Sequence, residues 1–473
     1  PGEPPRHVLV NGRCVVRDGK LVAAVIDALH ARARDLVVER IHDRALGRGR
    51  RHQASRHVRT GVGIGERRQH LGRRLEVAVR RHQAVDALVR ALEVVPTDDR
   101  ALDELLNRLQ SHDRIALDTE FHREKTYFPR LALIQLAWAD GIAIVDPLTC
   151  DASKLNRIFG EKHLIVLHAA QQDLDVMTHA MKTVPENIFD TQIAAGFLGY
   201  STPSLASLVN SELKLVLPKG DRLTDWLRRP LSDGQKSYAA SDVEHLLEIH
   251  DRLMSKLEER GRLTWAADAC EELRVRKMGP GDPADAWQKQ KDVRALKPRT
   301  RGVLAALAEW RERRAMASDI PPRQVLPDLA LQSIAQREPT NIGDLAQSRG
   351  VDDRHTRGAI GQEILAAVAR GKDHPIEISS NEGDEVERHL RPAITLISAW
   401  ISEVARIEHV DTALLATRHD IVAYLRQDVD SRLATGWRLD LIGEQLDDLL
   451  QGKAGLSFDG KGGLKMISAM PNQ

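Results

Sequence analysis

The stretch that most constrains this chain is residues 115–121 (IALDTEF), in which three apolar residues lead directly into two acids. The apolar residues predict a buried β-strand. Because side chains on a strand alternate between its faces, Asp118 and Glu120 share one face and lie about 7 Å apart along the chain. Neighbouring carboxylates repel each other unless a cation lies between them, and Mg²⁺ and Mn²⁺ prefer carboxylate oxygen. Taken alone, the stretch fits a metal site or two solvated acids at a strand edge.

The length and composition limit the remaining possibilities. A chain of 473 residues predicts roughly three domains. Only three cysteines are present, widely spaced at Cys14, Cys150 and Cys270, which excludes a disulfide framework and a cysteine zinc site. The sequence contains no apolar run of about 18 residues and no apolar core of signal-peptide type near its start. We therefore expect a cytoplasmic protein with no membrane partner.

Residues 1–93 differ in composition from the rest. The net charge of the chain is +1, yet residues 1–96 hold 20 Lys and Arg against 10 Asp and Glu, and the remainder holds 49 against 58. All but one of the early basic residues are arginine, and histidines are scattered among them. A basic arm that holds RNA through its phosphates would have this composition. We favour the alternative of a basic, disordered or non-native extension, because a misplaced start would produce the same pattern.

Residues 94–275 predict an α/β domain. Thr97 is expected to cap a helix whose apolar residues recur at helical spacing over residues 101–109. Asp140-Gly141 predicts a hairpin turn between two strands, and another helix is expected near residues 153–159. The predicted strands cover residues 115–121, 131–138, 142–146 and 164–167. An antiparallel meander followed by alternating strands and helices predicts a mixed sheet flanked by helices.

The glycine- and proline-rich residues 278–283 predict a domain boundary. Residues 276–294 are therefore interpreted as a linker. Beyond them the pattern is almost wholly helical, and residues 295–373 and 384–468 are each long enough for a small helical bundle.

Two further features of the α/β domain could bring acids to the same place. Asp173 follows the strand predicted at residues 164–167, at the edge where open α/β sheets bind ligands. Tyr238 and Asp242 are four residues apart and share one face of a predicted helix. Asp173 could instead complement a helix dipole, and Tyr238 with Asp242 could be a surface pair. In combination with residues 115–121, the three features favour a metal site.

These motifs, in this order, resemble those of the DEDD exonucleases with a tyrosine in the third motif, and among them the bacterial ribonuclease D family. The matching stretches are residues 115–121, 127–136, 146–148, 168–173, 190–192, 225–231 and 238–242. Residues 297–331 resemble the start of an HRDC domain, and the final segment resembles a second one. The resemblance implies an α/β ribonuclease H-like exonuclease domain with a mixed sheet, followed by two all-α HRDC-type helical domains. Residues 1–93 match nothing in the family.

The resemblance also implies the site. Two divalent ions, Mg²⁺ or Mn²⁺, would activate water and neutralise charge on the phosphate. Tyr238 would orient the attacking water. A phenol with a pKa near 10 is protonated near neutral pH, so it is a poor candidate for the base that deprotonates the water. The implied metal ligands are Asp118, Glu120, Asp173 and Asp242. The residues expected beside the substrate are Thr119, Phe121 and His168. Trp226 fits either the core or a base-stacking surface.

The expected activity is 3′→5′ exoribonuclease hydrolysis that releases mononucleotides. The expected partner is RNA with a single-stranded 3′ end, such as tRNA precursors and other small structured RNAs, with no obligatory protein partner and a possible monomer. Two alternatives remain, since no residue visibly reads a 2′-hydroxyl. One is the same chemistry on DNA, and the other is RNA binding without catalysis.

Overall fold

The structure, a computed structural model, describes residues 7–10, 13–17, 20–21, 92–217, 224–377 and 382–468. It divides into two compact units, Pro1–Leu75 and Glu76–Gln473. In the first unit it describes an antiparallel sheet of three short strands, which are β1 (His7–Val10), β2 (Arg13–Arg17) and β3 (Lys20–Leu21). Most of the basic segment 1–93 lies outside the described residues, so the expectation for it stays a prediction.

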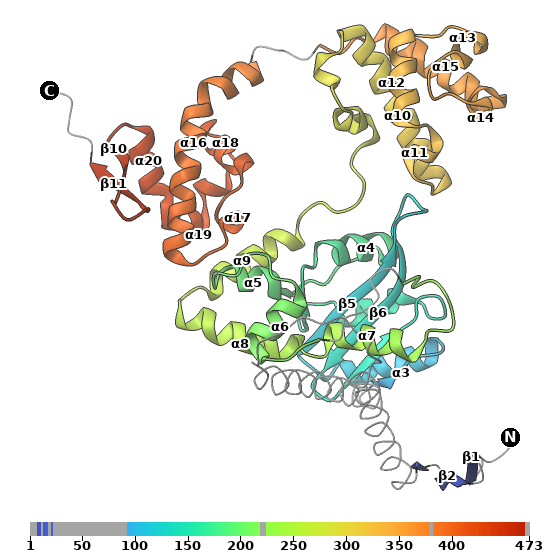
Figure 1. The fold of residues 1–473 in the computed structure, drawn as a ribbon, viewed down its shortest axis with the longest axis vertical. Helices are drawn as coiled ribbons and strands as arrows, with labels where there is room; N and C mark the ends of the chain where they lie inside the picture. The colour runs from blue at the N-terminus through green and yellow to red at the C-terminus, as the bar shows by residue number, and fades with distance from the viewer. Residues whose placement is uncertain are drawn as a thin grey trace, which may run out of the picture. The chain divides into compact units, whose positions relative to one another are not determined.

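The second unit contains a six-stranded mixed sheet with strand order β4-β7-β6-β5-β8-β9. Figure 1 labels its central strands, β5 and β6. Its strands are β4 (Leu92–Val94), β5 (Arg114–His122), β6 (Arg130–Trp138), β7 (Gly141–Val145), β8 (Leu164–Leu167) and β9 (Ile188–Asp190). Strands β5, β6 and β7 form the predicted antiparallel meander, and β8 joins β5 in parallel. The mixed sheet is therefore confirmed. The three-residue strands β4 and β9 were not predicted, because so short a run shows no period.

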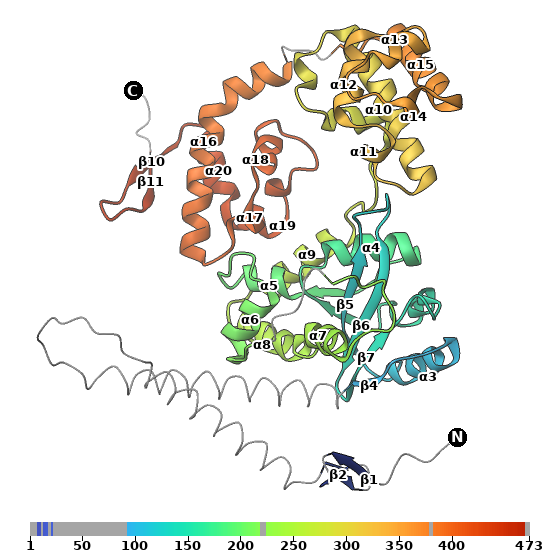
Figure 2. The same ribbon diagram turned by 45° about the vertical axis from the view of Figure 1, so that its right-hand side comes forward.

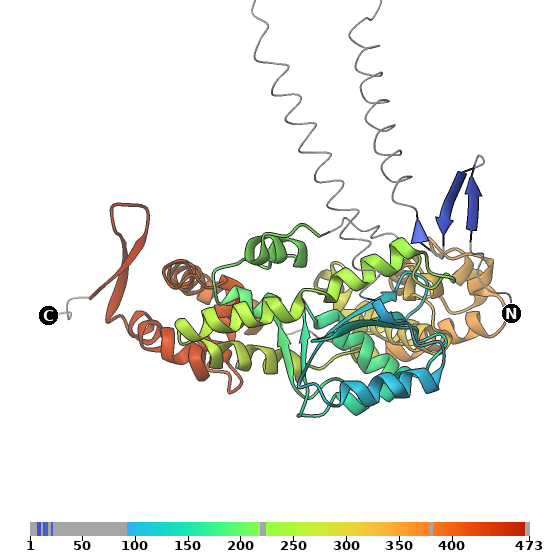
Figure 3. The ribbon, with the colours of Figure 1, turned by 90° about the horizontal axis from the view of Figure 1, so that it is seen from below.

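Helices cover both faces of the sheet (Figure 3). Ile115 and Leu117 pack with α3 and α4 on one face, and Ala116 packs with α7 and α8 on the other. Asp98, not Thr97, caps α3, because its side chain accepts from the Ala101 N–H at 2.8 Å. The helices are α3 (Asp99–Leu109), the 3₁₀ helix η1 (Ala152–Ile158), α4 (Gln171–Met181), α5 (Thr191–Gly196), α6 (Leu205–Leu213), α7 (Asp233–Val243), α8 (Leu246–Glu259) and α9 (Leu263–Arg274).

The next part of the chain is helical, as predicted, and has a hydrophobic core of its own. Helices α10 and α15 approach closely where a Cβ on Gly302 would lie 2.6 Å from the Gly371 carbonyl oxygen, so only glycine fits there. The elements are η2 (Pro283–Lys289), η3 (Val293–Ala295), α10 (Pro298–Ser318), α11 (Pro322–Val325), α12 (Asp328–Arg337), α13 (Ile342–Ala346), α14 (Asp353–Thr356) and α15 (Gly358–Asp373).

The last part is not purely helical, which corrects the all-α expectation. After its helices the chain forms an antiparallel hairpin of β10 (Ala454–Phe458) and β11 (Leu464–Ser468) (Figure 2). The Asp459 carboxylate stabilises the turn by accepting from the N–H groups of Lys461 and Gly463. The helical elements are α16 (Glu382–Glu408), α17 (Thr412–Leu415), α18 (Arg418–Leu425), η4 (Arg432–Ala434), α19 (Gly436–Arg438), η5 (Leu439–Gly443) and α20 (Glu444–Leu450).

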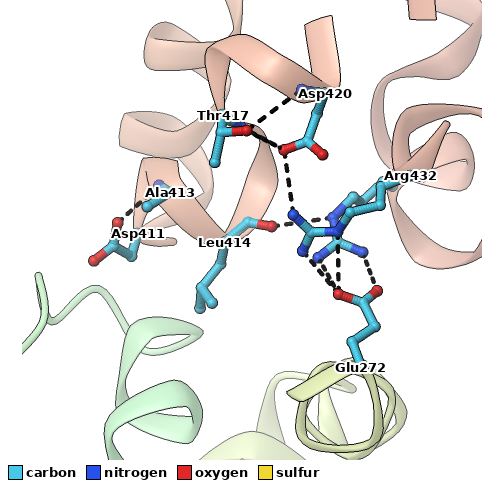
Figure 4. A network of polar contacts seen from close by, with 8 residues as sticks. Glu272, Asp411, Ala413, Leu414, Thr417, Asp420 and Arg432 are labelled. Carbon is cyan, nitrogen blue, oxygen red and sulfur yellow. Dashed lines mark hydrogen bonds and ion pairs between the residues drawn. The ribbon is translucent and has the colours of Figure 1, made fainter. Parts of the chain in front are cut away.

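These C-terminal helices share a hydrophobic core with the helices of the sheet domain. The Trp437 ring stacks on Trp265 of α9, with centroids 4.9 Å apart, and meets the edge of Phe197 at 5.2 Å. A polar network beside this core joins Glu272 of α9 to Arg432 and Arg438 (Figure 4). The sheet domain and the C-terminal helices are therefore bound together by apolar and ionic contacts.

Candidate active site

Strand β5 is paired on both sides, and it carries the two acids that the sequence singled out. Asp118 lies opposite Gln135 of β6, and Glu120 lies opposite Leu133. Each of Asp118, Glu120 and Asp242 offers a carboxylate oxygen, and these oxygens all lie within 4.8 Å of one another. The structure thus brings together three of the four predicted metal ligands.

Helix α7 supplies Asp242 and Tyr238. The helix begins at a capping box, in which Ser232 and Gln235 each accept from the other's backbone N–H. The Tyr238 ring stacks on Trp226 with centroids 6.0 Å apart and an angle of 27° between the planes. Trp226 is only 6% exposed, so it belongs to the core and supports Tyr238 instead of forming an open base-stacking surface.

Asp173 lies in the first turn of α4, close to the other acids but outside their 4.8 Å group. Its carboxylate accepts from the Thr119 hydroxyl at 2.5 Å. The start of α4 is fixed by Asp190, which is 1% exposed and accepts from the backbone N–H groups of Ala169 and Ala170 at 3.1 and 2.8 Å. Asp190 therefore helps to place Asp173, a role that its sequence position did not reveal.

Burial and mutual repulsion make these carboxylates hard to ionise. Burial raises the pKa of Asp118 well above its usual range, and the neighbouring acids raise it further. Burial, with repulsion from Asp242 and Asp173, raises the pKa of Glu120 to about 8. Burial raises the pKa of Asp173 and that of Asp242 to about 7 each. A site of this kind favours either protons or a bound cation.

The donor set fits hard divalent cations. None of the four acids forms an ion pair with another residue in the described part of the chain. Their donor atoms are all carboxylate oxygens, which are the ligands that Mg²⁺ and Mn²⁺ prefer. Because no described cationic side chain pairs with these acids, a metal ion can supply the balancing positive charge.

The three residues expected beside the substrate have the following surroundings. Thr119 is 5% exposed and its hydroxyl is engaged with Asp173. Phe121 is partly buried, with the Arg123 guanidinium 5.2 Å from its ring centroid. The His168 ring donates through Nε2 to the Pro203 carbonyl at 3.1 Å, and its Nδ1 lies 2.9 Å from the Thr191 hydroxyl. Their contacts with substrate stay predictions.

Arg229 is a supporting residue that sequence reasoning did not identify. Its guanidinium donates to both Asp146 carboxylate oxygens at 2.5 and 2.8 Å, and also to the carbonyls of Ala132 and Trp226. Ala132 lies at the register shift in β6, where its carbonyl is available to a side chain. Arg229 thus ties the segment containing Trp226 to the sheet. The sequence features that could have revealed this contact are the motifs at residues 146–148 and 225–231, which contain Asp146 and Arg229.

A mixed sheet with clustered acids on a central strand, beside a supported tyrosine, is the arrangement of a 3′–5′ exonuclease. A family model described as "3'-5' exonuclease" matches residues 94–258, and one described as "HRDC domain" matches residues 300–368. The HRDC model matches one segment, so the second HRDC-like domain stays a prediction. Among the described residues, no helix has the length and apolar character needed to span a membrane.

Named relatives refine this class. Ribonuclease D of Granulibacter bethesdensis is 32% identical over 77% of this chain and 94% of its own length. Ribonuclease D of Escherichia coli is 33% identical over 76% of this chain and 98% of its own. The crystal structure of Escherichia coli ribonuclease D matches with a TM-score of 0.68 and 32% identity, over 76% of this chain and 98% of that one. The chain belongs to the ribonuclease D family, and it is a 3′–5′ exoribonuclease.

Proposed function

We propose that this chain removes nucleotides one at a time from the 3′ end of RNA and releases 5′-mononucleotides by two-metal-ion hydrolysis. The observation that carries the proposal is the cluster of Asp118, Glu120 and Asp242, whose oxygens lie within 4.8 Å of one another. None of these acids forms an ion pair with a described residue, so a cation that binds here displaces protons and not a charged side chain.

Each residue has a distinct role in this proposal. Asp118 would help to hold both of two divalent cations, Mg²⁺ or Mn²⁺, while Glu120 and Asp242 would hold one of them and Asp173 the other. When bound there, such ions would supply a hydroxide near neutral pH and neutralise charge on the attacking and leaving oxygens. Tyr238 orients the attacking water with its hydroxyl, and Trp226 holds the Tyr238 ring in place.

The proposed substrates are tRNA precursors and other small structured RNAs with an unpaired 3′ end. The solved Escherichia coli relative is described as an exoribonuclease involved in structured RNA processing, which supports this class. We propose that the ring of Phe121, which follows Glu120 on β5 and is partly buried, stacks on a terminal base. We propose that the chain acts as a monomer. We also propose a cytoplasmic location, with which the free, buried Cys150 and Cys270 agree, because thiols stay reduced there.

The test is digestion of single-stranded RNA labelled at either its 3′ or its 5′ end, with Mg²⁺, Mn²⁺ or EDTA. We expect immediate release of labelled mononucleotide from 3′-labelled RNA only, and no release in EDTA or with Asp118→Ala. Asp140→Asn is the control, because Asp140 is an exposed acid in the β6–β7 turn. Full activity of Asp118→Ala would refute the assigned roles.

A matched DNA oligonucleotide decides between the polymers. Faster release from DNA than from RNA would favour DNA as the substrate. The DNA should carry deoxyuridine in place of thymidine, so that only the 2′-hydroxyl differs between the two polymers. Binding of RNA without release from either polymer would indicate a non-catalytic RNA-binding protein.

A further inference from the structure

Gln135 is a polar residue in the middle of a buried strand. Every residue of β6 from Leu131 to Trp138 is buried, and the Gln135 side chain is 0% exposed. Neither its Nε2 nor its Oε1 has a hydrogen-bond partner among the residues that the structure describes. Buried amides in folded proteins are nearly always hydrogen-bonded, so this one requires a physical reason.

The register of the sheet identifies what lies beside this amide. Gln135 is directly opposite Asp118 of β5 on one side and Ile144 of β7 on the other. Directly opposed residues in antiparallel strands place their side chains on the same face. Leu133 and Ala137, two positions away along β6, share that face as well. Of these four neighbours, only Asp118 has a polar side chain.

Helix α7 covers this face of the sheet. Ala239 of α7 belongs to a small buried cluster with Leu133 and Ile144, and α7 contacts both β6 and β7. The Ala239 side chain offers no polar atom to the amide. The same helix carries Asp242, so Gln135 lies under the element that completes the acidic cluster.

We infer that Gln135 is a positioning residue: when cations bind, its Nε2–H, which has no partner among the described residues, donates to the Asp118 carboxylate and orients it toward them. The inference rests on the proposed function, since it concerns the same cluster. A carboxylate has about four acceptor positions and can bind a cation while it accepts from an amide. Hydrogen bonds of this kind fix the orientation of metal ligands, and their loss typically lowers metal affinity by about 10- to 100-fold.

The experiment is calorimetric titration of the full chain with Mn²⁺ alone, together with thermal unfolding of the metal-free protein. Gln135→Met keeps the volume and removes the donor. We expect its Kd for Mn²⁺ to rise about tenfold or more, with a metal-free Tm equal to or above wild type. Leu133→Met, opposite Glu120 on the same face, is the matched control and should leave the Kd unchanged.

The outcomes separate this inference from the proposed function. Wild-type protein that binds Mn²⁺, with Gln135→Met binding it equally well, overturns the role of Gln135 alone. Wild-type protein that does not bind Mn²⁺ overturns both. If Gln135→Met does not fold, a crystal structure of the wild type with Mn²⁺ tests the proposed hydrogen bond directly. We expect Gln135 Nε2 within about 3.2 Å of an Asp118 oxygen, and an amide directed elsewhere overturns the inference.

Discussion

Glu272 offers a quantitative test of how the C-terminal helices are held on the exonuclease domain. Its carboxylate accepts from Arg438 at 2.6 and 3.1 Å, and from Arg432 at 2.7 and 3.2 Å. The Arg438 side chain is only 3% exposed. Glu272→Ala therefore leaves a buried guanidinium with the Leu414 carbonyl as its remaining hydrogen-bond acceptor among the described residues.

The expected loss can be worked out from this geometry. Removing one partner of a buried ion pair costs about 3–5 kcal/mol. The Glu272 side chain is 36% exposed, which favours the lower end, about 3 kcal/mol. At roughly 2 °C per kcal/mol for a domain of this size, the Tm should fall by roughly 6 °C.

The assay is differential scanning calorimetry of the full chain at neutral pH. The transition of the exonuclease domain and the C-terminal helices should shift together, because they share a core. Glu271→Ala is the matched control, since Glu271 is exposed and, among the described residues, pairs only with Arg274 of the same helix. That pair should contribute less than about 1 kcal/mol. Equal, small shifts for both variants would refute the reasoning.

Three further predictions concern the active site. Thr119→Val removes the hydrogen bond to Asp173, so kcat should fall about tenfold or more with little change in RNA binding. An unchanged kcat would show that this hydrogen bond is not needed to position Asp173. Tyr238→Phe should lower kcat by about 10², at constant KM, in steady-state assays with labelled RNA; a rise in KM alone would contradict a water-orienting role. The pKa is raised to about 8 for Glu120 and to about 7 for Asp173. The metal-free folded protein therefore binds more protons than the unfolded chain between pH values of about 4 and 8, and its stability should fall as the pH rises through this range. Thermal scans in EDTA should show this decline and scans with Mn²⁺ should not. Glu120→Gln should weaken the decline, because it removes one of the carboxyls that gain protons on folding. A metal-free Tm that rises with pH would contradict the prediction.

The sequence predicted the elements whose patterns are local. The alternation in residues 115–121 predicted β5, and the spacing of Tyr238 and Asp242 placed both on one helix. It missed the hairpin at β10 and β11, although Asp459-Gly460 is a turn signal with alternating residues on either side. The helical character of the preceding segment outweighed that signal.

The supporting residues of the site depend on contacts that no local pattern carries. Gln135 is notable only because the register places it opposite Asp118. Arg229 and Asp146 are 83 residues apart, and Thr119 and Asp173 are 54 apart. Such pairs follow from the topology of the sheet, so the sequence indicated the acids but not the residues that hold them.

The central claim is that Asp118 serves the chemical step by holding cations. The most direct measurement is the single-turnover rate of 3′-nucleotide release by Asp118→Asn, at RNA concentrations that saturate it. Cation assistance contributes several kcal/mol to such a step, so the rate should fall by about 10³ or more while RNA affinity changes little. A rate within about tenfold of wild type at full RNA occupancy would contradict the account.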